Sequence, residues 1–177
     1  VSNLDEYVKN YTDFIKTHGI KQFFEMDVDA VRPLSQVEKY RDYIEQSTRQ
    51  QSIPVWHKSR GIKYFEDMCK DYSYVAVGGI VTKEIPKSKF EVFHKLIQIA
   101  HHHGARIHGL GIGSPSTIKK YAFDSVDSSS WNSCAFGGGH VYQFKDGNIV
   151  KIPFNSSKKY DRHKVVRHNF SEWVKFS

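Results

Sequence analysis

The chain has 177 residues, of which 39% are hydrophobic and 14% aromatic, enough for one domain with a buried core and too apolar for an intrinsically disordered chain. Its net charge of +7 favours a polyanionic partner, most simply nucleic acid. Two cysteines are too few for a disulfide framework, no apolar run approaches the roughly 18 residues of a membrane span, and no signal-peptide pattern opens the chain. We therefore expect a cytoplasmic protein with no membrane partner.

Helical and strand periodicities alternate along the sequence. Leu4, Val8, Tyr11 and Ile15 recur at helical spacing ahead of Gly19, which predicts a first helix that the glycine ends. In chain order we expect a helix over 4–18, a strand over 21–29, a helix from Ser35 to about Thr48, a strand over 52–59, a helix over 60–72, a strand over 74–81, a helix near 87–103, a strand over 106–113, a short helix over 114–121, a strand over 121–131, a hairpin over 140–154 and a helix near 170–176.

These elements predict one α/β domain over residues 1–177 with a basic C-terminal tail from about 155 to 177, because no linker, repeat or low-complexity tract interrupts them. Strands that alternate with helices form βα units and a parallel sheet. The periodicity fits both a doubly wound sheet and a (β/α)₈ barrel of the TIM type. We favour the later part of a barrel, with the first one or two strands missing from this chain.

The barrel is favoured because polar or small residues fall near the carboxyl ends of successive strands. In a barrel these ends converge on one mouth, where active sites are built. The residues in question are Asp27, Asp29, His57, Lys58, Gly78, Gly79, His108 and Asp127.

The strand over 21–29 places Glu25, Asp27 and Asp29 on one face by simple alternation. The functional interpretation is that these acids line the inside or the mouth of the barrel. The structural alternative is that they cap helices or pair with Lys58 or Arg60. Convergence of several polar residues at consecutive strand ends favours the functional interpretation.

The strand over 121–131 contains two aspartates, although aspartate is depleted in strands. Alternation directs Asp127 towards the mouth and Asp124 outward near the start of the strand. Glycines at the ends of the strands over 74–81 and 106–113 would let a planar base or a phosphate approach the backbone, or would simply form tight βα turns.

The segment 158–168 is basic with an aromatic residue interleaved. It is either a surface for a nucleic-acid backbone or a solvated terminus. The candidate backbone-contacting residues are Lys158, Lys159, Arg162, Lys164 and Arg167.

Four segments taken together, "FFEMDVDA", "VAVGGIVTKE", "HGLGIGSP" and "DSVDSSSW", resemble the tRNA-guanine transglycosylase superfamily, in particular its phage and mobile-element branch that modifies DNA with 7-deazaguanine. The resemblance covers roughly residues 20 to 145. It implies a (β/α)₈ barrel and exchange of guanine for a 7-deazaguanine base in DNA or tRNA, in the host cytoplasm if the protein is phage-encoded.

The resemblance also implies roles for individual residues. Asp127 matches the family's nucleophile, which attacks the sugar C1′ and forms a covalent intermediate, and Asp124 matches the first aspartate of the same motif. Asp27 matches the base-recognising aspartate, and His57 stands where other members offer a glutamine. The glycine pair that closes over the base and the residues beneath it correspond to Gly78, Gly79, Leu110 and Gly111.

Two parts of the family pattern are absent. Its Asp-Ser-Gly segment belongs on a strand before this chain begins, so a second chain is a possible source of the N-terminal strands. Its zinc motif Cys-x-Cys-x-x-Cys…His is missing, and Cys134 alone cannot replace it, so we expect no zinc and no other cofactor.

Two other functions stay open from the sequence. The first is a non-catalytic half of a split transglycosylase that binds nucleic acid or a partner. The second is a metal-dependent barrel hydrolase with Asp27, His57, His108 and Asp127 as ligands, because carboxylate and imidazole groups suit Zn²⁺ or Mn²⁺.

Overall fold

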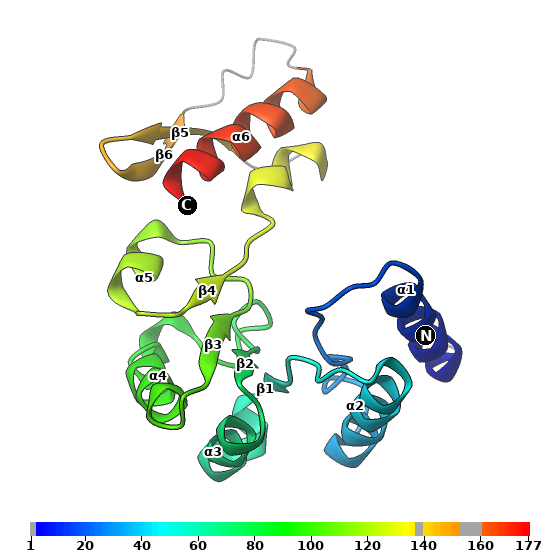
Figure 1. The fold of residues 1–177 in the computed structure, drawn as a ribbon. Coiled ribbons are helices and arrows are strands. Elements are labelled where there is room, and N and C mark those ends of the chain that lie inside the picture. Colours follow the sequence, from blue (N-terminus) through cyan, green and yellow to red (C-terminus); the bar gives the residue numbers. More distant parts are fainter. Residues whose placement is uncertain (1–2, 137–139, 153–160) are drawn as a thin grey trace. The chain divides into compact units, whose positions relative to one another are not determined.

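The computed structural model describes residues 3–136, 140–152 and 161–177, which form two compact units (Figure 1). The first unit comprises Val1–Leu110 and Ala122–Ser125, and the second comprises Gly111–Tyr121 and Val126–Ser177. Within the described ranges, no helix has the length and apolar character needed to cross a membrane.

A sheet in the order β1-β2-β3-β4 organises the first unit. Its strands are β1 (Val55–Trp56), β2 (Tyr74–Val77), β3 (Arg106–Gly109) and β4 (Ser125–Val126). The pairs β1–β2 and β2–β3 are parallel, so their carboxyl ends lie at the same edge. The expected α/β class with a parallel sheet is confirmed.

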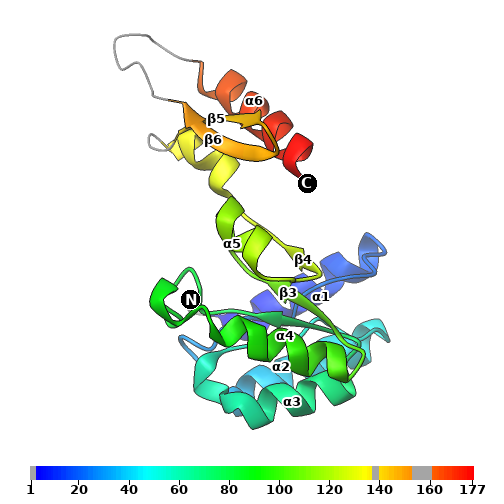
Figure 2. The same cartoon turned by 90° about the vertical axis from the view of Figure 1, so that its left-hand side faces the viewer.

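Four helices belong to this unit: α1 (Leu4–Thr17), α2 (Leu34–Thr48), α3 (Gly61–Asp71) and α4 (Val92–His102), with short 3₁₀ turns η1 (Lys58–Arg60) and η2 (Lys87–Lys89). Figure 1 shows α2, α3 and α4 in a row on one side of β1, β2 and β3, and Figure 2 shows the same helices from a second direction. Trp56 points to this side, where its ring meets Phe65 of α3 edge-on at 5.6 Å. Burial of such residues against the helices holds the sheet in place.

The opposite face of the sheet carries smaller and more polar side chains. Ile53, Val55 and Ala76 form an apolar cluster there, with Tyr74 and Leu110 packed against it. By alternation, His57 and Gly78 share this face with Val55 and Ala76. This face therefore leads directly to the polar residues that follow the strands.

The strand expected over 21–29 is reduced to one parallel bridge between Phe24 and Ile53. Its backbone pairs through the Ile53 amide with the Phe23 carbonyl and the Glu25 amide with the Ile53 carbonyl. Beyond Met26 the chain turns, and the amides of Val31 and Arg32 both bond to the Val28 carbonyl. The prediction of a nine-residue strand here was wrong because the chain curls after this short contact.

The second unit consists of α5 (Pro115–Lys120), η3 (Ser130–Phe136), the antiparallel strands β5 (Val141–Lys145) and β6 (Asn148–Ile152), and α6 (Arg162–Phe176). The predicted hairpin is confirmed, and Asp146 and Gly147 both have positive φ, as a two-residue turn that matches strand twist requires. The last helix is longer than expected, because Asp161 caps it by accepting the amides of His163 and Lys164.

Helix α6 contacts the hairpin through polar side chains. The Tyr142 amide donates to Asn169 Oδ1 at 2.9 Å, and the Phe144 amide donates to Glu172 Oε2 at 2.7 Å. The His168 ring donates through Nε2 to the Tyr142 carbonyl at 2.8 Å. These bonds satisfy backbone groups of β5 that β6 does not pair.

Candidate functional site

A histidine held between two carboxylates lies where β1 ends. His57 follows Trp56 directly and is buried, with 7% of its surface exposed. Its Nε2 lies 2.8 Å from Asp27 Oδ1, and its Nδ1 lies 2.8 Å from Glu84 Oε2. Glu84 comes from the loop after β2 and Asp27 from the segment after the Phe24–Ile53 bridge, so three separate segments contribute to this contact.

The neighbouring acids are tied to arginines. Arg60 binds Asp29 with two nitrogens, at 2.9 Å through Nε and 2.5 Å through Nη2. Its Nη1 reaches Glu25 Oε1 at 3.1 Å, and Arg41 reaches Glu25 Oε2 at 3.1 Å. For Glu25 and Asp29 the structure therefore bears out the structural alternative, an ion pair with Arg60. Glu25 and Asp29 share Arg60, and Asp27 and Asp29 lie 2.8 and 4.0 Å from His57 Nε2, so the three acids lie close together although the strand expected to align them is not formed.

These contacts fix the charge of His57. Burial lowers the pKa of His57, but hydrogen bonds to Asp27 and Glu84 outweigh it and raise the pKa to about 9. Burial raises the pKa of Glu84, but hydrogen bonds from His57 and the Ser59 amide outweigh it and bring the pKa below its ordinary value. At neutral pH the group is an imidazolium between two carboxylates.

The two glycines after β2 leave space for this arrangement. A Cβ on Gly78 would lie 2.8 Å from His57 Nε2 and 2.9 Å from Val55 Cγ1. Gly79 has φ of +77°, and a Cβ there would lie 2.7 Å from Glu84 Oε2. The pair predicted to close over a base thus also has a local reason to be glycine, which is room for His57 and Glu84.

Residues after β3 and β4 meet within the second unit. The Gly111 amide donates to Asp127 Oδ1 at 2.9 Å, and Gly111 has φ of +74°. Asp127 directly follows β4 and is exposed. Leu110 belongs to the first unit, where it packs against the apolar cluster of Ile53, Val55 and Ala76.

The other secondary candidates are His108, Lys58 and Asp124, of which Lys58 also bonds to Glu84 through its backbone. His108 lies within β3, and its Nδ1 is 2.6 Å from Ser125 Oγ. Lys58 is exposed in η1. Asp124 accepts the Ile107 amide at 2.7 Å and pairs with His101 at 3.0 Å, so it fastens the start of β4 to β3.

The basic tail is described only in part. Arg162, Lys164 and Arg167 are exposed on α6. Lys158 and Lys159 lie outside the described residues.

One group of side chains has the spacing of a metal site. Ligand atoms of Asp27, Asp29 and His57 lie within 4.8 Å of one another. However, Arg60 occupies both oxygens of Asp29, and both ring nitrogens of His57 bond to carboxylates. A metal ion would have to displace a guanidinium and a ring proton, so the donor set in this conformation fits a proton better than a metal.

No family model matches this chain, and neither does any curated protein or solved structure. The likeness to transglycosylases therefore rests on the four sequence motifs alone.

Sequence reasoning missed Glu84 and the part played by Arg41. Glu84 is the last residue of the quoted segment "VAVGGIVTKE", and an acid so close to a glycine exit was an available signal. Arg41 lies within the helical pattern of α2, where an arginine normally faces solvent, so no signal in the sequence distinguishes it.

Proposed function

We propose that this chain is a base-exchanging glycosyltransferase, or the catalytic part of one, that replaces guanine with a 7-deazaguanine base in DNA or tRNA. The observation that carries the proposal is the state of Asp27. Its side chain is 42% exposed, one oxygen is fixed by His57, and the other has no hydrogen-bond partner among the described residues. A fixed, outward-facing carboxylate suits the two adjacent N–H donors of a guanine-like amidine edge.

Asp127 is the proposed nucleophile. Its carboxylate oxygen bonds to the sugar C1′ while the bond from C1′ to guanine breaks, and the departing ring nitrogen takes a proton from water. The incoming base then attacks C1′ through its own ring nitrogen, returns a proton to water, and displaces the carboxylate. Two displacements of this kind retain the configuration of the sugar.

A (β/α)₈ barrel is the proposed complete architecture. A doubly wound sheet reverses its strand order at a switch point and carries helices on both faces, whereas a barrel runs in sequential order with helices outside. The order β1-β2-β3-β4 and the single row formed by α2, α3 and α4 support the barrel (Figure 1). Its remaining strands are proposed to come from elsewhere, including from a second chain.

The test is incorporation of labelled guanine into duplex DNA and into tRNA, run in parallel. We expect incorporation into one of them, and loss of both incorporation and covalent adduct in Asp127→Asn. Asp71→Asn, at the exposed end of α3, is the matched control and should keep full activity. An unchanged adduct yield in Asp127→Asn would refute the assignment of the nucleophile.

The alternatives give different outcomes. Nucleic-acid binding without incorporation, at any concentration of added base, would favour the non-catalytic half of a split enzyme. A metal-dependent hydrolase is the second candidate. Of its expected ligands, Asp27 and His57 have metal-site spacing together with Asp29, although Arg60 and Glu84 occupy part of this donor set. Elemental analysis of the purified protein separates it, because that function requires stoichiometric metal.

A further inference from the structure

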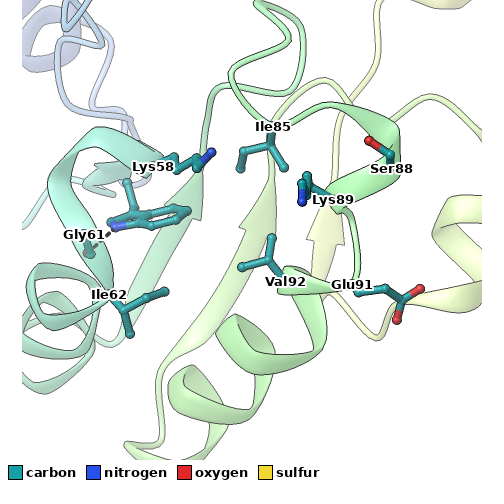
Figure 3. Close-up of a pocket in the computed structure, with 9 residues that line it drawn as sticks. Lys58, Gly61, Ile62, Ile85, Ser88, Lys89, Glu91 and Val92 are labelled. Carbon is teal, nitrogen blue, oxygen red and sulfur yellow. Dashed lines mark hydrogen bonds between the residues drawn. The ribbon is translucent and has the colours of Figure 1, made fainter.

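A pocket of about 480 Å³ lies in the first unit between the start of α3 and the start of α4 (Figure 3). Its volume falls within the range of small-molecule sites, about 300 to 1,000 Å³. The His57 contact does not line it, so it is a separate feature of the same sheet edge.

The walls of the pocket are mostly apolar. Trp56, Ile62, Ile85 and Val92 contribute to them. The indole N–H of Trp56 donates to the Gly61 carbonyl at 2.8 Å, so the ring has no donor left for a ligand. These walls suit a flat or branched hydrocarbon body rather than a polar one.

Two lysines add positive charge to this apolar pocket. In Figure 3 the amino groups of Lys58 and Lys89 lie on either side of Ile85. Neither has a carboxylate within 4.0 Å in the part of the chain that the structure describes. Glu91 also lines the pocket, but its carboxylate is directed away from both lysines and pairs with His94 at 3.6 Å.

We propose that this pocket binds a small organic anion, with its apolar body against Trp56, Ile62 and Val92 and its carboxylate, sulfonate or phosphate between Lys58 and Lys89. Burial of the body supplies the nonpolar part of the affinity. The charge-assisted hydrogen bonds from the two ammonium groups supply the preference for an anion. Anion binding in this pocket does not depend on base exchange, and a separate experiment tests it.

The test compares two fluorescent dyes of the same shape, anilinonaphthalene sulfonate and the neutral phenylnaphthylamine, by titration of the intact chain. We expect the anionic dye to bind more tightly. In the double variant Lys58→Gln/Lys89→Gln its affinity should fall by roughly tenfold, to that of the neutral dye, whose own affinity should not change. Val92→Trp, which fills the pocket, should weaken both dyes.

The matched control is Lys87→Gln/Lys95→Gln, which removes the same charge from exposed lysines that do not line the pocket. Near-UV circular dichroism and urea unfolding of each variant are used to check that it is folded. Equal losses in the two double variants would mean a general charge effect and overturn the proposal. So would unchanged affinities in folded Val92→Trp, or no binding of the anionic dye by the parent chain.

Discussion

His57 is charged at neutral pH because Asp27 and Glu84 each accept one of its ring protons. The charge has a consequence for the neighbouring carboxylate. Asp27 is held as an acceptor in one orientation, since the imidazolium can only donate to it. A glutamine at this place could rotate its amide and either donate to Asp27 or accept from it. The charged histidine can only donate, so it restricts the hydrogen bonds that Asp27 can make.

This charge predicts a pH dependence of stability. The folded-state pKa of His57 is about 9 against an ordinary 6.5, so its contribution is fully present below pH 6.5 and is lost as pH rises through 9. We expect the free energy of unfolding in urea to fall by up to about 3 kcal/mol over this range. His57→Gln should remove that dependence. A proton NMR titration of the imidazole with a midpoint near 6.5 would contradict the assignment.

Because Glu84 lies against Gly79, we expect a methyl group at this position to lower the stability of the protein. Gly79→Ala and Gly104→Ala both force an L residue into positive φ, at +77° and +73°. Only at Gly79 does the added Cβ meet another group, Glu84 Oε2 at 2.7 Å. We expect Gly79→Ala to destabilise the protein by about 1–3 kcal/mol more than Gly104→Ala in urea unfolding. Equal costs would show that Glu84 moves aside freely.

At the scale of elements, Arg60 joins three parts of the first unit. It precedes α3, binds Asp29 in the turn after the Phe24 bridge, and reaches Glu25, whose Oε1 also accepts the Val55 amide of β1 at 2.8 Å. The Glu25 side chain is fully buried and that of Arg60 is 2% exposed. The short pairing of Phe24 with Ile53 is thus stabilised by charged side chains rather than by a long ladder of backbone hydrogen bonds.

This arrangement predicts a large effect of Arg60→Met. The substitution leaves Asp29 without its guanidinium and Glu25 with Arg41 as its remaining guanidinium partner, and breaking one partner of a buried pair costs about 3–5 kcal/mol. The control is Lys63→Met, which removes an exposed pair with Asp67 on the same helix. It should change the free energy of unfolding by less than about 1 kcal/mol. Similar effects of the two substitutions in urea unfolding would contradict the structural role of Arg60.

The sequence predicted the type of each helix or strand that has one apolar face, but it did not predict the lengths of the strands. The helices α1 to α4 and the hairpin follow from periodicity and from the Asp146–Gly147 turn. The strand expected over 121–131 shrinks to β4, because alternation cannot show that the chain enters η3 at Ser130. The start of α6 was missed although Asp161 is a regular N-cap residue followed by helix-forming positions.

The sequence predicted Asp27, Asp29, His57 and the two glycines as members of the site, but neither Glu84 nor the pairing of the side chains. Alternation placed Asp27 and Asp29 on one face, and strand ends pointed to His57 and Gly78. Which acid meets the histidine and which meets Arg60 depends on the curl of the chain after Met26, a tertiary feature with no sequence period. For the same reason Glu84 could not be joined to His57 by sequence spacing.

At the scale of the whole molecule, the net charge of +7 predicts binding to nucleic acid that weakens with salt. Part of that charge is exposed on α6, at Arg162, Lys164 and Arg167. If each contacts one phosphate, changing all three to Gln should reduce the slope of log affinity against log salt by about 3 for duplex DNA. Fluorescence anisotropy at several salt concentrations measures this slope.

A control variant removes three charges from helices of the first unit and should leave the slope nearly unchanged. Its positions are exposed in α1 and α4: Lys9, Lys16 and Lys95. Equal slopes for the two triple variants would assign the binding to overall charge rather than to α6.

The side chains that α6 lays along β5 have a consequence for self-association. The outward amides of a hairpin are a template onto which another chain can add a strand, and such addition is a common route to aggregation. Here the amides of Tyr142 and Phe144 are already bonded to Asn169 and Glu172. While α6 stays packed against the hairpin, these amides cannot pair with an added strand, so the contact between helix and hairpin prevents fibril growth along β5.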